Sequence, residues 1–77
     1  MEDIYVNLKD LSYLLNKKHL NILFDHVSNN FLKFRIYDNK YEVIFKDNKY
    51  EVFKFEYPNN ISHYITSTMG DVLNYVQ

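Results

Sequence analysis

The chain has 77 residues, of which nine are basic, ten are acidic, one is glycine and none is cysteine. This length predicts one domain, 1–77, and the lack of cysteine excludes disulfides and cysteine-based metal sites. A hydrophobic content of 47% at a net charge of −1 excludes intrinsic disorder. The longest continuous apolar runs, such as 22–24, are far shorter than the ~18 residues of a membrane span. We therefore expect a soluble protein without a membrane partner.

The composition is biased toward residues with A/T-rich codons. Phe, Tyr, Met, Ile, Asn and Lys account for 40 of the 77 residues, whereas Gly, Ala, Arg and Pro together account for three. Such a bias is typical of low-GC bacteria and of the phages and mobile elements that infect them. It also explains much of the lysine and tyrosine content without reference to function.

The N-terminal third is predicted to form a helix or a helix pair. The leucines at positions 8, 11, 14 and 15 share one helical face, with Asn7 as the N-cap and Asp10 in the first turn. The apolar residues of 20–28 point in nearly the opposite direction, so we predict a break over 16–18, with Asn16 as a left-handed stop. A second helix is predicted at 20–28, and a strand is the alternative because apolar residues also alternate there.

An internal repeat marks the centre of the chain. Residues 38–46 read DNKYEVIFK and residues 47–55 read DNKYEVFKF, so six residues recur at a spacing of nine. The repeat predicts a three-stranded antiparallel meander with turns at Asp38–Asn39 and Asp47–Asn48. The predicted strands are 31–37, 40–46 and 49–57.

These turns predict a register with one apolar and one charged face. On the apolar face the expected pairs are Ile36 with Tyr41, Phe34 with Val43, Leu32 with Phe45, Phe45 with Tyr50 and Val43 with Val52. On the charged face they are Arg35 with Glu42 and Ile44 with Glu51, with Lys33 and Lys46 nearby.

The end of the third strand conflicts with this register. Lys54 and Glu56 would lie on the apolar face, and Phe53, Phe55 and Tyr57 on the charged one. We predict a β-bulge near Phe53, because one extra residue returns every later side chain to the other face. The alternative is an aromatic patch on the outer face of the sheet.

The C-terminal segment 61–76 places its apolar residues in one helical stripe, which predicts an amphipathic helix. The alternative is a fourth strand at 61–67 followed by a shorter helix capped by Ser67 or Thr68. Gly70 favours this alternative, since it is costly inside a helix. The predicted fold class is α+β, with an N-terminal helix or helix pair, a three- or four-stranded antiparallel meander and a C-terminal amphipathic helix.

Motifs for catalysis, cofactors and metals are missing from the sequence. The four serines lie outside any GxSxG pattern, and a single glycine cannot build a phosphate-binding loop. His19 and His26 are two helical turns apart, too far to share a metal, which leaves a site assembled from His26, His63 and a carboxylate as the alternative. We expect no enzymatic activity, no cofactor and no metal.

A nucleic-acid partner is not expected either. The predicted α-β-β-β-α order resembles the double-stranded RNA-binding domain, whose last helix begins with basic residues. Here 61–68 contains no Lys or Arg, and basic and acidic residues alternate over 31–57. This alternation dilutes the positive charge that phosphate binding needs.

Aromatic residues make up 18% of the chain, and aromatic side chains are enriched at protein interfaces. We expect a non-catalytic protein-binding module, encoded by a phage or mobile element, that occludes a host protein such as a nuclease in the bacterial cytoplasm. The chain is similar to anti-CRISPR and other anti-defence proteins in size, composition and predicted topology. The alternatives are a self-associating structural or accessory protein that forms homo-oligomers and, third, a nucleic-acid-binding domain. The candidate contact residues are Lys33, Arg35, Glu42, Ile44, Glu51, Phe53, Phe55 and Tyr57.

Overall fold

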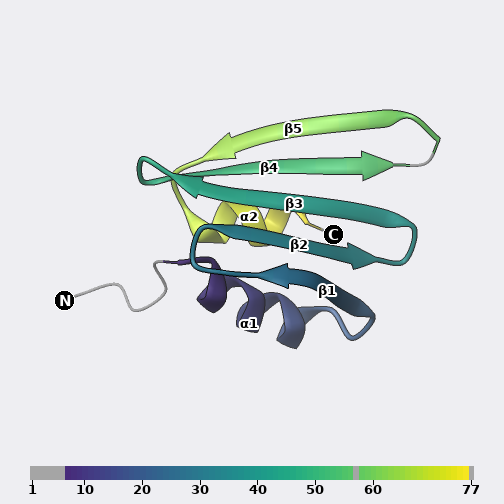
Figure 1. Cartoon of the computed structure of the whole chain (residues 1–77), viewed down its shortest axis with the longest axis horizontal. Helices are drawn as coiled ribbons and strands as arrows, with labels where there is room; N and C mark the ends of the chain where they lie inside the picture. The colour runs from purple at the N-terminus through teal and green to yellow at the C-terminus, as the bar shows by residue number, and fades with distance from the viewer. Residues whose placement is uncertain (1–6, 57, 77) are drawn as a thin grey trace.

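The computed structural model describes residues 7–56 and 58–76. In chain order the elements are α1 (Leu8–Lys18), β1 (Ile22–Val27), β2 (Phe31–Ile36), β3 (Asn39–Lys46), β4 (Lys49–Glu56), β5 (Asn60–Thr66) and α2 (Met69–Tyr75). The strands form one antiparallel meander in sequence order (Figure 1). Both helices contribute to a single core with one face of this sheet. The fold is α+β as predicted, but the sheet has five strands rather than three or four.

Helix α1 begins as its sequence predicts. The side-chain oxygen of Asn7 accepts hydrogen bonds from the backbone N–H groups of Lys9, at 2.9 Å, and Asp10, at 3.3 Å. The helix ends at Lys18, within the predicted break at 16–18, but the left-handed stop at Asn16 is wrong: Asn16 is helical, and the N–H of His19 still donates to the carbonyl of Leu15. The buried residues of the helix are Leu8, Leu11 and Leu15.

The predicted second helix at 20–28 is wrong, and its alternative, a strand, is observed as β1. Ile22 is buried and Leu23 is exposed, as the alternation of a strand requires. Pairing with β2 outweighs the helical pattern, which would have placed Leu20 in the core. In the structure Leu20 is 94% exposed.

The first hairpin of the predicted meander is shifted by two residues. Ile36 pairs with Asn39, so the turn is made by Tyr37 and Asp38 instead of Asp38 and Asn39. Tyr37 adopts a φ of 54° to make this turn. The faces are as predicted because the shift is even, but the partners change: Phe34 faces Tyr41, Leu32 faces Val43, Lys33 faces Glu42 and Arg35 faces Lys40.

The second hairpin has the predicted register. Phe45 faces Tyr50, Val43 faces Val52 and Ile44 faces Glu51. Asp47 and Asn48 form the turn with φ values of 54° and 61°. A turn with two positive φ values matches the twist of the strands that it joins, and Asp and Asn tolerate that conformation.

The predicted bulge near Phe53 is wrong. Pairing between β3 and β4 continues without interruption as far as Lys40 and Phe55, so Phe53 and Phe55 stay on the face opposite the helices. Lys54 remains on the helix side, where its ammonium lies 5.8 Å from the centre of the Tyr41 ring and 3.4 Å from the Glu56 carboxylate. Burial lowers the pKa of Lys54, but Tyr41 and Glu56 outweigh it and raise the pKa above its usual 10.5.

The C-terminal part follows the predicted alternative, a strand and a short helix, rather than one long helix. β5 pairs with β4 over its whole length. The Thr68 hydroxyl accepts a hydrogen bond from the N–H of Asp71 at 3.2 Å and caps α2. The core lies between the sheet and the two helices, and its fully buried side chains include Leu8, Leu11, Leu15, Leu32, Phe34, Tyr41, Val43, Val52, Val72 and Val76.

Candidate interaction surface

The sheet face turned away from the helices is called the outer face. No helix in the described part of the chain packs on it, since α1 and α2 both join the core on the other side. Alternation along the strands brings side chains from all five strands to this face. Asp25, Lys33, Arg35 and Lys40 form a charged part on β1 to β3, called the charged half, whereas apolar side chains lie on β3 to β5 among Glu42, Glu51 and His63.

Five apolar side chains of the outer face lie on three neighbouring strands: Ile44, Phe53, Phe55, Ile61 and Ile65, which together are called the apolar patch. Phe55 pairs directly with Ile61 across β4 and β5, while Glu51 lies between Ile44 and Ile65 in the neighbouring row. Ile61 is 65% exposed and Ile65 is 53% exposed. Phe53 and Phe55 are partly buried by their neighbours. The patch therefore presents aromatic rings at its centre and accessible isoleucines at the sheet edge.

A polar pair lies inside the apolar patch. The rings of Phe53 and His63 stack with their centroids 4.6 Å apart and their planes 10° apart. The Nε2 atom of His63 lies 2.8 Å from Oε2 of Glu51. Both side chains are about four-tenths exposed, so solvent weakens this ion pair. The pair orients the imidazole over Phe53 and gives the patch one directional polar group.

The charged half contains one well-formed ion pair. Arg35 of β2 donates from Nε and Nη2 to the two carboxylate oxygens of Asp25, at 3.0 and 3.1 Å. Asp25 is the extra residue where the pairing of β1 with β2 shifts its register. Lys33 and Lys40 are exposed nearby, and Lys33 faces Glu42 across the strands. Positive and negative groups are thus interleaved on this half of the face.

The structure brings most of the predicted contact residues onto one face. Ile44, Phe53 and Phe55 belong to the apolar patch, and Glu42 and Glu51 pair with its members. Lys33 and Arg35 lie on β2, in the charged half. Tyr57 lies outside the described residues.

Sequence reasoning missed the β5 contribution to this surface. Ile61, His63 and Ile65 alternate in the chain, which is the signal of a strand face. The same residues also fit a helical stripe when joined to 69–76, and that longer pattern obscured the alternation. The β-rich residues 63–66, the capping residues Ser67 and Thr68, and Gly70 argued for the break.

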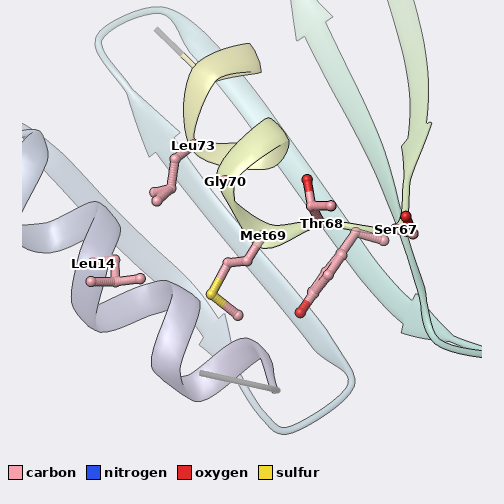
Figure 2. Close-up of a pocket in the computed structure, with 7 residues that line it drawn as sticks. Leu14, Ser67, Thr68, Met69, Gly70 and Leu73 are labelled. Carbon is pink, nitrogen blue, oxygen red and sulfur yellow. The ribbon is translucent and has the colours of Figure 1, made fainter. Parts of the chain in front are cut away.

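A cleft lies on the helix side of the sheet, between the two helices. This cleft of about 390 Å³ is lined by Leu14, Tyr50, Ser67, Thr68, Met69, Gly70 and Leu73. Figure 2 shows Leu14 of α1 facing Met69 and Leu73 of α2 across it. None of these lining residues carries a charge at neutral pH, and the Thr68 hydroxyl already caps α2. The polar side-chain groups of the cleft are thus the hydroxyls of Tyr50, Ser67 and Thr68.

Within residues 7–56 and 58–76, no group of three or more His, Cys, Asp or Glu side chains could hold a metal ion. His26 and His63 lie on β1 and β5, the two opposite edges of the sheet, so they do not form the alternative metal site. Neither of the two described helices has the length and apolar character needed to cross a membrane.

Comparisons of the chain with protein-family models, curated proteins and solved structures find no match.

Proposed function

We propose that this protein is a non-catalytic protein-binding module that contacts its partner through the outer face of the sheet. The apolar patch is the observation that carries this proposal. Apolar side chains that gather on one accessible face of a protein are candidates for protein contact.

The arrangement of side chains supports a protein partner. Protein interfaces combine an apolar, aromatic centre with a polar rim. Here Phe53 and Phe55 lie at the centre of the patch, and Glu42 and Glu51 lie beside them. The adjacent charged half would orient the partner, because complementary charges set the register of a complex.

A protein partner fits the charge of this face better than a nucleic acid does. Lys33, Arg35 and Lys40 are the basic groups of the charged half. Asp25 pairs with Arg35, and Glu42 faces Lys33. Binding to phosphates depends on clustered, unpaired positive charge, which this interleaved arrangement does not supply.

The proposed biological role is occlusion of a host protein, such as a nuclease, in the cytoplasm of a bacterium. The A/T-rich codon bias supports an origin in a phage or mobile element. A small domain with one open sheet face suits occlusion, because blocking a surface requires only contact area and no chemistry.

The test is affinity purification from a low-GC bacterial lysate with tagged protein. The double variant Phe53→Ser/Phe55→Ser removes the centre of the patch, and Tyr13→Ser removes an aromatic residue that is 57% exposed on α1. We expect wild type and Tyr13→Ser to retain the same stoichiometric partner, and the double variant to lose it while keeping its circular-dichroism spectrum. Absence of any stoichiometric partner, or equal retention by all three proteins, would refute the proposal.

A further inference from the structure

The two edges of the sheet are built differently. The edge strand β1 has a register shift next to Asp25, and bulges and charges at an edge discourage pairing with another chain. The other edge strand, β5, is seven residues long and pairs regularly with β4. It contains no Lys, Arg, Asp, Glu or Pro, and it includes the β-branched residues Ile61, Ile65 and Thr66. Of the two edges, β5 therefore lacks the features that oppose pairing.

The direction of the β5 backbone groups follows from the pairing pattern. Residues that flank a two-residue hairpin turn exchange backbone hydrogen bonds, and hydrogen-bonded pairs then alternate with non-bonded ones. Lys46 and Lys49 flank the turn and form the first hydrogen-bonded pair. Counting in alternation from this pair, the backbone N–H and C=O groups of Val52 point away from β3 and toward β5. Tyr64, which pairs with Val52, therefore directs its own backbone N–H and C=O groups toward β4. The backbone N–H and C=O groups of Ile61, His63 and Ile65 consequently point away from the sheet.

We propose that β5 pairs antiparallel with β5 of a second copy of this chain, across a two-fold axis at His63. In this register every outward-pointing residue meets another one: Ile61 faces Ile65 of the second copy, and the two His63 residues face each other. Each such pair exchanges two backbone hydrogen bonds. The two sheets join into one, with both outer faces on the same side.

The side chains favour this register over registers shifted by one or two residues. A shift by two residues in either direction leaves both isoleucines of each copy without an apolar counterpart, because one then faces His63 and the other faces Ser67 or Asn59. After a shift by one residue, the outward-pointing N–H and C=O groups of one copy would face residues of the second copy whose backbone groups are already bonded to β4. The outer face of one sheet would also continue into the helix side of the other. In the proposed register no Lys, Arg, Asp or Glu of β5 meets a like charge. Glu51 lies beside His63 in each copy, with Oε2 2.8 Å from Nε2.

The dimer goes beyond the proposed function, because it concerns the free protein. It would place Ile61 and Ile65 of both copies along the seam and fuse the two apolar patches into one surface. A partner would then meet a doubled patch, with the charged halves at its two far ends.

Single cysteines test the register directly, since the chain has no native cysteine. In the proposed dimer the two cysteines of the His63→Cys variant face each other directly across the two strands. The Cα atoms of such a directly opposite pair lie close enough for a disulfide. The matched control Ile61→Cys places its thiols four residues apart along the strand direction, about 13 Å. We expect rapid oxidative cross-linking of His63→Cys and little of Ile61→Cys. Equal cross-linking of both variants, or none with His63→Cys, would overturn the proposal.

Sedimentation of the purified protein over a concentration series provides the second measurement. Wild type should shift from monomer to dimer as concentration rises, and it should not grow beyond the dimer. His63→Pro removes an outward N–H that no strand of the monomer uses, and proline is tolerated at such edge positions. It should keep the monomer fold and raise the dimer dissociation constant about tenfold or more, from loss of hydrogen bonds in both copies. A wild-type protein that stays monomeric at high micromolar concentration contradicts the dimer, whatever the partner experiment shows.

Discussion

Phe53 of β4 stacks on His63 of β5 with the ring centroids 4.6 Å apart, on the sheet face opposite both helices. The aromatic end of β4 is therefore stabilised by its neighbour across the strands and not by the core. On the other face of the same strand, the Lys54 ammonium lies 5.8 Å from the centre of the Tyr41 ring and 3.4 Å from the Glu56 carboxylate. These two contacts let β4 keep a regular register although, near its end, aromatic residues lie on the outer face and a lysine lies on the helix side.

The first prediction compares two phenylalanines that differ in location. Phe34 is fully buried beneath the helices, whereas Phe53 is partly exposed. We expect Phe34→Ala to lower the free energy of unfolding by about 3–5 kcal/mol, from lost burial and the cavity left behind. Phe53→Ala should cost about 1 kcal/mol, mainly from the lost stacking on His63. Urea denaturation measures both, and similar losses for the two variants would mean that Phe53 belongs to the core.

Local signals predicted the central part of this fold. The repeated Asp-Asn pair marked the turn at Asp47 and Asn48, where both residues have positive φ. The N-cap at Asn7 and the leucine spacing after it predicted α1. Each of these features depends on residues close together in the chain, so the sequence alone contains the information.

The two edge strands could not be predicted in the same way. An edge strand buries only one side and pairs with only one neighbour, so its apolar residues need not alternate strictly. In β1, Leu23 is 59% exposed and Val27 is 41% exposed, and with Phe24 they mimic a helical stripe. Their pairing partners are set by β2, which the local pattern of β1 does not contain.

The outer face was only partly predictable for the same reason. Three members of the apolar patch, Ile44, Phe53 and Phe55, follow from the meander. Placing Phe53 outside required knowing that Lys54 could be accommodated beside Tyr41 and Glu56. That contact joins residues on two strands, and the bulge was the simpler solution from sequence.

The second prediction concerns backbone conformation at Tyr37. This residue has a φ of 54° and is 78% exposed, and left-handed backbone is unfavourable for a residue with a large side chain. We expect Tyr37→Gly to raise the free energy of unfolding by about 1 kcal/mol. Because the Tyr37 hydroxyl accepts a hydrogen bond from Asn21, Tyr37→Phe serves as the control that removes this bond alone. Thermal unfolding of both variants measures the two effects separately, and a glycine variant less stable than the phenylalanine variant would contradict the prediction.

The third prediction concerns acid stability at the start of α2. The Thr66 hydroxyl donates a hydrogen bond to the Asp71 carboxylate at 2.7 Å, and this bond, together with Thr68, lowers the pKa of Asp71 below its usual 3.8. A lowered folded-state pKa stabilises the fold above pH 3.8, and this contribution is lost as pH falls through the folded-state value. Thr66→Val removes the hydroxyl but keeps the branched shape. We expect NMR titration to show a higher pKa for Asp71 in the variant.

The stability of Thr66→Val should follow the same pH dependence. Wild type and variant should differ most near neutral pH, where the carboxylate is charged, and the difference should shrink under acid. A difference that is constant from neutral to acidic pH would show that Thr66 acts independently of the Asp71 charge, through packing or through the bond that its hydroxyl accepts from the Thr68 N–H.

The fourth prediction concerns Gly70, the second residue of α2. A Cβ atom added there meets nothing within 4 Å, so alanine introduces no clash, and it is favoured over glycine in a helix by about 1 kcal/mol. We expect Gly70→Ala to raise the free energy of unfolding by about that amount. Thr68→Ala, which removes the N-cap hydroxyl bonded to the Asp71 N–H, should lower it by about 1 kcal/mol. Equilibrium denaturation of both variants tests whether α2 is formed as a helix in the folded protein. If neither substitution changes stability, α2 contributes little to folding, and the burial of Met69 and Val72 against the sheet would have to arise without a stable helix.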